Sequence, residues 1–73
     1  MYRGNIAQLF PEEEYGSIRT KSGENVRFNN QCLWNIRFDE LIAGQEVEFE
    51  TQPTRTGPLA FHIRPYIVLP AAA

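Results

Sequence analysis

Residues 15–29 read YGSIRTKSGENVRFN, in which two runs suited to β-strands flank a short loop that contains Gly23. A glycine-containing loop of this length between two such runs is typical of a β-hairpin. Because side chains alternate across a strand, Ile18, Val26 and Phe28 should share one face of the hairpin. The other face then carries Tyr15, Ser17, Arg19, Arg27 and Asn29. The hairpin is therefore expected to have one apolar face and one mixed face.

Three more strands are expected, at residues 4–10, 46–51 and 59–63. The alternation is clearest in EVEFET at 46–51, where Val47 and Phe49 lie on one face and the glutamates on the other. A proline-led segment at 11–14 and a turn at 54–58 separate strands. The predicted core consists of eight side chains on the inward faces: Ile6, Ile18, Val26, Phe28, Val47, Phe49, Phe61 and Ile63.

Helical periodicity is missing from the sequence, so no helix is available to cover a sheet. Residues 31–41 are interpreted as a long loop with a short helical turn at 38–41. Five strands of this kind bury their apolar faces by closing into a barrel, which makes the protein all-β and antiparallel. The barrel is expected to span 1–65, and residues 66–73 are interpreted as an apolar C-terminal tail or linker.

Composition restricts the function. The chain has 73 residues, a formal net charge of −2 and a pI near 5.2. These values argue against a protein that binds a phosphate backbone through its overall charge alone. One cysteine, Cys32, and one histidine, His62, predict neither a disulfide nor a metal site. No nucleotide-binding or nucleophile motif is present, so we expect no cofactor and no enzymatic activity. A cytoplasmic monomer without membrane contact is expected, since the sequence lacks a long apolar segment.

The order of these motifs resembles the cold-shock domain, an OB-type barrel of five strands that binds single-stranded RNA or DNA. The resemblance runs from Gly4 to about Arg64. Its matching parts are Gly4-Asn5-Ile6, Tyr15-Gly16-Ser17-Ile18, Gly23-Glu24-Asn25-Val26, Gly44-Gln45-Glu46-Val47-Glu48-Phe49-Glu50 and Gly57-Pro58. The resemblance implies a five-stranded antiparallel OB-type β-barrel and a binding face on the outside of the first three strands.

The sequence departs from the family on that face. The Lys-Trp-Phe run of strand one is Ala7-Gln8-Leu9, Ser17 replaces a phenylalanine, and only Tyr15 of the expected platform is aromatic. Stacking contributes about 1–3 kcal/mol per base, so weak binding is expected. The nucleic-acid-binding residues that we predict are Tyr15, Arg19, Arg27 and Asn29 on the strands, with Trp34 and Phe38 in the loop.

Other interpretations remain open at this point. Arg19 and Arg27 could instead pair with acids such as Glu13 or Glu24, and Trp34 could plug one end of the barrel. A second hypothesis for the function is an adaptor that has lost nucleic-acid binding and holds a protein partner or adjoining domain, with the apolar tail as a contact.

Overall fold

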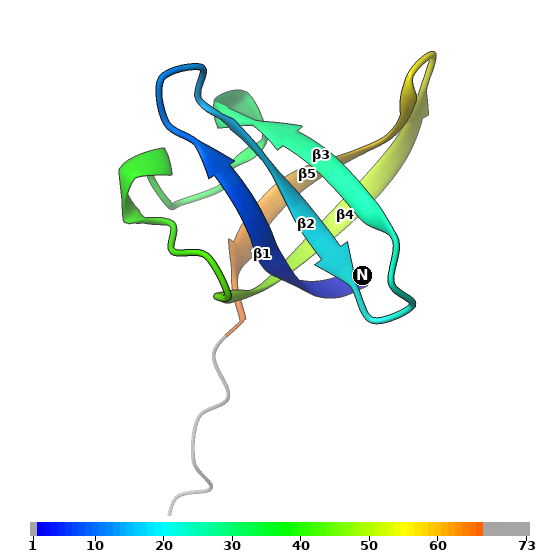
Figure 1. Cartoon of the computed structure of the whole chain (residues 1–73), viewed down its shortest axis with the longest axis horizontal. Coiled ribbons are helices and arrows are strands. Elements are labelled where there is room, and N and C mark those ends of the chain that lie inside the picture. Colours follow the sequence, from blue (N-terminus) through cyan, green and yellow to red (C-terminus); the bar gives the residue numbers. More distant parts are fainter. Residues whose placement is uncertain (1, 67–73) are drawn as a thin grey trace, which may run out of the picture.

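Five strands close into a barrel in the computed structural model, which describes residues 2–66 (Figure 1). The strands are β1 (Tyr2–Phe10), β2 (Tyr15–Thr20), β3 (Asn25–Asn29), β4 (Glu46–Thr54) and β5 (Gly57–Pro65). Two short 3-10 helices, η1 (Asn30–Cys32) and η2 (Phe38–Glu40), lie between β3 and β4. The hairpin strands have the predicted bounds, whereas β1, β4 and β5 are longer than predicted. The predicted tail at 66–73 lies outside the described residues apart from Tyr66.

The prediction of a wholly antiparallel barrel is wrong at one seam. The order around the barrel is β1-β2-β3-β5-β4, and β4 pairs with β1 to close it. All of these pairs are antiparallel except β3 with β5, where Arg27 lies opposite Leu59. A closed ring with an odd number of strands cannot alternate in direction throughout. At least one pair of neighbouring strands must therefore be parallel. It is the pair of β3 and β5, since the long connection after β3 lets the chain cross the barrel before β4 begins.

The core follows the predicted alternation except in β5. Seven of the eight predicted core residues are buried, and Phe61 is only half-buried. A register shift between Glu48 and Glu50 places two residues of β5 opposite one of β4, and His62 has a φ of 53°. This β-bulge changes the alternation, so Ala60 and Ile63 face inward and Phe61 does not.

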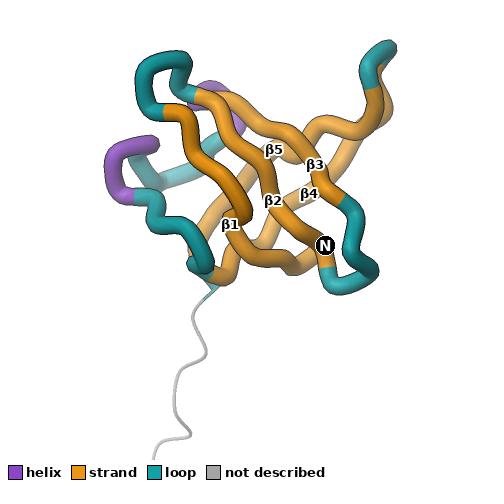
Figure 2. The backbone as a smooth tube through the Cα atoms, viewed as in Figure 1, coloured by secondary structure: helices purple, strands orange, loops and turns teal. Residues whose placement is uncertain are grey.

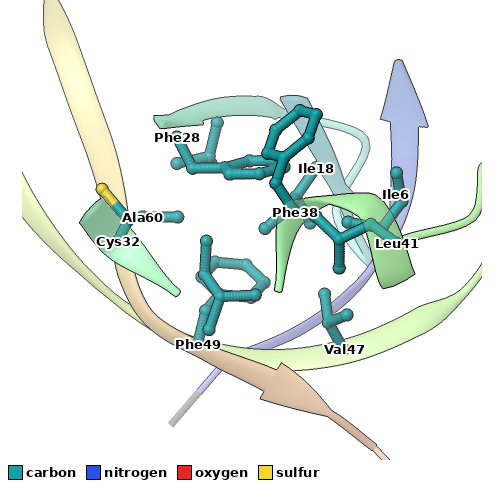
Figure 3. Close-up of a cluster of buried hydrophobic side chains, with 11 residues drawn as sticks. Ile6, Ile18, Phe28, Cys32, Phe38, Leu41, Val47, Phe49 and Ala60 are labelled. Atoms are coloured by element: carbon teal, nitrogen blue, oxygen red, sulfur yellow. The ribbon is translucent and has the colours of Figure 1, made fainter. Parts of the chain in front are cut away.

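The β3–β4 connection closes one end of the barrel. Figure 2 shows both 3-10 helices at the same end as the β1–β2 turn. Cys32, Phe38 and Leu41 are buried there and join the core, which is drawn in Figure 3. Trp34 is 48% exposed and therefore does not plug the barrel. The buried residues Phe38 and Leu41 of the connection have that role instead.

Gly16 is required by the close approach of its neighbours. A Cβ at this position would lie 2.5 Å from the Gln8 carbonyl oxygen and 2.9 Å from Cζ of Phe28. These distances are shorter than van der Waals contact, so a side chain there would push β1 and Phe28 away. The glycine thus lets β2 lie close to both the β1 backbone and the Phe28 ring, directly beside Tyr15.

Candidate nucleic-acid interface

Three rows of outward side chains cross β1, β2 and β3. The pairing of the strands sets each row, because residues opposite one another share a face. The rows are Phe10-Tyr15-Asn29, Gln8-Ser17-Arg27 and Asn5-Arg19-Asn25. The face defined by these nine residues is called the β1–β3 face below. It brings together four of the predicted site residues, namely Tyr15, Arg19, Arg27 and Asn29.

Phe10 also belongs to this face, although the sequence pattern does not predict it. Its ring stacks on Tyr15 with centroids 4.6 Å apart and planes at 17°, and 40% of the residue is exposed. Phe10 reaches the outward face because β1 contains an extra residue at Ala7, between the pairs Ile6–Ile18 and Gln8–Ser17. This bulge reverses the alternation along the strand. Alternation in the sequence alone contains no signal for it.

The β4–β5 hairpin forms a wall beside the face. In Figure 1 this hairpin, coloured yellow at its tip, extends beyond the barrel. Nη2 of Arg27 donates a hydrogen bond of 2.7 Å to Oγ1 of Thr56 and so ties β3 to the hairpin turn. Between them lies a groove of about 280 Å³, lined by Tyr15, Arg27, Phe28, Asn29, Thr54, Thr56, Pro58 and Leu59. We call this the Arg27 groove.

Asn29 has a structural role in addition to its place on the face. Its Oδ1 accepts a hydrogen bond of 2.9 Å from the backbone N–H of Gln31, and the side chain thereby caps η1. The Sγ of Cys32 also lies 3.4 Å from this oxygen. The side-chain oxygen is therefore engaged within the protein, while the residue as a whole remains exposed.

No protein-family model matches this chain. The chain is 32% identical over 63 residues to Cold shock protein CspB of Geobacillus stearothermophilus, a match that covers 86% of this chain and 96% of the relative. The chain belongs to the cold-shock protein family. This cold-shock chain thus combines the family's barrel with a β1–β3 face on which polar residues outnumber aromatic ones.

The two loop residues predicted to bind nucleic acid lie away from the β1–β3 face of this cold-shock chain. Phe38 is 8% exposed and its ring packs against Phe28, 6.2 Å between centroids, so it belongs to the core. Trp34 is exposed, but its ring lies 5.7 Å from that of His62 and under the Arg64 guanidinium, both on β5. Long loops carry no alternation from which these directions could be predicted.

Charge is distributed unevenly around the barrel. Among residues 2–66, Arg19 and Arg27 form no salt bridge, so the expected alternative of pairing with Glu13 or Glu24 is not adopted. The glutamates of β4 are each within 4.0 Å of a basic side chain: Glu46 of Lys21, Glu48 of Arg64 and Glu50 of His62. Moreover, β4 is adjacent to neither β2 nor β3. The acidic strand is therefore not paired with either of the strands that carry Arg19 and Arg27.

Residues 2–66 contain no group of three or more side chains placed to hold a metal ion. Cys32 is a free, buried thiol. His62 contacts Glu50 through Nδ1 at 2.9 Å and lies against the rings of Trp34 and Phe61. Within the same residues, no helix has the length and apolar character to span a membrane.

Proposed function

We propose that this chain is a monomeric cold-shock module that binds single-stranded RNA or DNA with modest affinity through its β1–β3 face. The observation that carries the proposal is the Phe10–Tyr15 stack beside the Arg27 groove. Bases stack on aromatic rings, guanidinium groups hold phosphates, and side-chain amides contact base edges. Tyr15, Arg19, Arg27 and Asn29 have these functions in the proposal, and Phe10 joins them.

The fold supports this choice of face. The strand order β1-β2-β3-β5-β4 with closure from β4 to β1 fits an OB-type barrel, which is the assignment we propose. OB-type barrels bind oligonucleotides on the face of strands two and three and on the loops after strands one and four. Tyr15 lies on β2, Arg27 on β3 and Thr56 in the β4–β5 turn. The proposed site thus coincides with the surface that this architecture favours.

The proposed affinity is modest because few groups contribute. The stacked pair is one small platform, and each stacked base contributes about 1–3 kcal/mol. Exposed acids at Glu12, Glu13 and Glu14 lie in the turn next to that platform and repel phosphate. We expect a Kd of about 1–100 µM at moderate salt, in the range of sequence-independent binding. The role is binding without catalysis.

The proposal is tested by anisotropy of dye-labelled single strands of about eight nucleotides, with a duplex of the same sequence as control. Saturable binding of the single strand, together with chemical-shift changes at Tyr15, Arg19 and Arg27, is the expected result. The duplex should bind more weakly because its bases are not free to stack. Absence of single-strand binding at about 1 mM protein, tenfold above that range, would exclude the proposal.

The second candidate is an adaptor for a protein partner, and the position of Trp34 favours it. This large ring is 48% exposed on the β5 side of the barrel, away from the β1–β3 face. Exposed tryptophans are frequent anchors in protein interfaces. For an adaptor, substitutions of Tyr15 and Arg27 leave the function intact, whereas for a nucleic-acid-binding module they abolish oligonucleotide binding.

A further inference from the structure

The side-chain oxygen of Asn29 accepts hydrogen bonds within the protein, whereas its NH2 group is left for a ligand. A backbone N–H can only donate, so the atom that faces Gln31 N at 2.9 Å must be the amide oxygen. This contact fixes the orientation of the amide. Among residues 2–66, Nδ2 donates no hydrogen bond. Asn29 therefore offers a ligand two N–H donors, and its acceptor is already occupied.

Arg27 adds further donors to the same groove. The guanidinium has five N–H groups and no acceptor, and the structure uses Nη2 for Thr56. Most of the hydroxyl groups nearby are also engaged: Oγ1 of Thr54 contacts the Gly57 carbonyl at 2.5 Å, and Oγ1 of Thr56 accepts from Arg27. No Asp or Glu is among the described residues that line the groove. The Arg27 groove is therefore rich in donors and lacks a carboxylate acceptor.

We infer that the Arg27 groove selects bases with a carbonyl oxygen, O4 or O6, at the position where cytosine and adenine carry an exocyclic amine, and so favours uracil, thymine, guanine and hypoxanthine over cytosine and adenine. This inference rests on the proposed function, because it names the bases that the β1–β3 face accepts. An asparagine that reads adenine needs both its donor and its acceptor, and the acceptor of Asn29 caps η1. The exocyclic amine of cytosine needs a carboxylate or similar acceptor, whereas arginine donates readily to guanine O6 and N7.

The direct test compares two pairs of bases that match in size and differ in the groups on their edges. Strands of about eight nucleotides are compared as oligouridine against oligocytidine, and as a uridine strand carrying hypoxanthine against one carrying adenine. A favourable base contact is worth about 1–3 kcal/mol, so we expect about tenfold tighter binding of oligouridine than of oligocytidine, and of the hypoxanthine strand than of the adenine strand. Measurements at neutral pH keep cytosine unprotonated.

A variant separates the role of Asn29 from general charge effects. Asn29→Asp retains an oxygen for the η1 cap, since aspartate is as good an N-cap as asparagine, and replaces the donor by an acceptor. The preference for uridine over cytidine should disappear or reverse. The matched control, Asn25→Asp, adds the same charge at the other end of β3 on the same face. It should lower both affinities and leave their ratio unchanged.

The outcomes distinguish the inference from the function on which it depends. Equal affinity of the wild-type protein for uridine and cytidine strands overturns the inference and leaves single-strand binding in place. An unchanged ratio in Asn29→Asp, with thermal melting showing a folded variant, overturns the assignment to Asn29. Failure of every strand to bind rejects the proposed function, and the inference with it.

Discussion

Phe10 and Tyr15 lie directly opposite each other on β1 and β2, and their rings stack with centroids 4.6 Å apart. Phe10 is in this position only because of the bulge at Ala7, which reverses the alternation of β1. Near-parallel rings support each other, and such a pair contributes about 0.5–1.5 kcal/mol beyond its buried area. The pair is therefore an ordered platform on an otherwise polar face, which makes its removal the most direct test of the site.

Replacing either ring should weaken single-strand binding. Tyr15→Leu and Phe10→Leu each remove a stacking surface, for which we expect a loss of about 1–3 kcal/mol, roughly 5- to 150-fold in Kd. Anisotropy titrations at fixed salt measure the change. Tyr2→Leu is the control, because Tyr2 is exposed on β1 but stacks on Phe49 of β4. A folded Tyr15→Leu variant with wild-type affinity would contradict the proposed platform.

Salt dependence should be shallow. With two or three phosphates neutralised, the slope of log K against log salt is expected to be about −1.5 to −2. Arg27→Gln should reduce its magnitude by about 0.7, the value for one phosphate on a single strand. Arg37→Gln removes the same charge from a side chain that pairs with Asp39 at 2.9 Å, and should leave the slope unchanged. A wild-type slope steeper than about −4 would indicate a larger phosphate footprint.

The acidic β1–β2 turn should oppose binding. Glu12 and Glu13 are exposed next to the Phe10–Tyr15 pair, so the double variant Glu12→Gln, Glu13→Gln removes two charges that repel phosphate. We expect a several-fold lower Kd at low salt and little difference at high salt, since screening acts on exposed charges. Titrations at two salt concentrations measure this. An effect that grows with salt would be inconsistent with electrostatic repulsion.

Phe38 should affect stability and not affinity. Phe38→Leu replaces a buried ring by a smaller apolar side chain, and the free energy of unfolding should fall by about 1–2 kcal/mol. Urea unfolding followed by Trp34 emission measures the loss. Ile42→Ala, at a residue 69% exposed in the same connection, should change stability by less than about 0.5 kcal/mol. A large loss of oligonucleotide affinity in a folded Phe38→Leu variant would contradict this prediction and indicate that Phe38 contributes to the interface.

Much of the fold follows from local sequence. Alternation in YGSIRT and NVRFN predicted β2 and β3 with their correct bounds and faces, because a strand with one buried side must alternate. The short helical turn near Phe38 was also predicted. The first helix, η1, was missed, since its cap depends on an asparagine that also belongs to β3. The candidate site on β2 and β3 was predicted for the same reason as the strands that carry it.

Three features depended on the closed barrel. The parallel seam between β3 and β5 arises because an odd number of strands cannot alternate around a ring, a constraint that no single segment contains. The bulges at Ala7 and His62 bend long strands and shift their alternation, which exposes Phe10 and buries Ala60. The direction of Trp34 and Phe38 was set by the packing of the connection across the barrel end.

Alternation, composition and the order of motifs were sufficient to predict the all-β class, the family and two outward arginines on a hairpin. These predictions depend on the order and spacing of residues along the chain. The groove beside Arg27 required the tertiary structure. It exists because the β4–β5 turn, Thr56 included, lies against Arg27, 29 residues away in the sequence. None of the β4 glutamates lines it, because closure makes β4 the neighbour of β1 and β5 and not of β3. Local patterns determine which face a side chain takes, whereas distances between faces are determined only when the sheet closes.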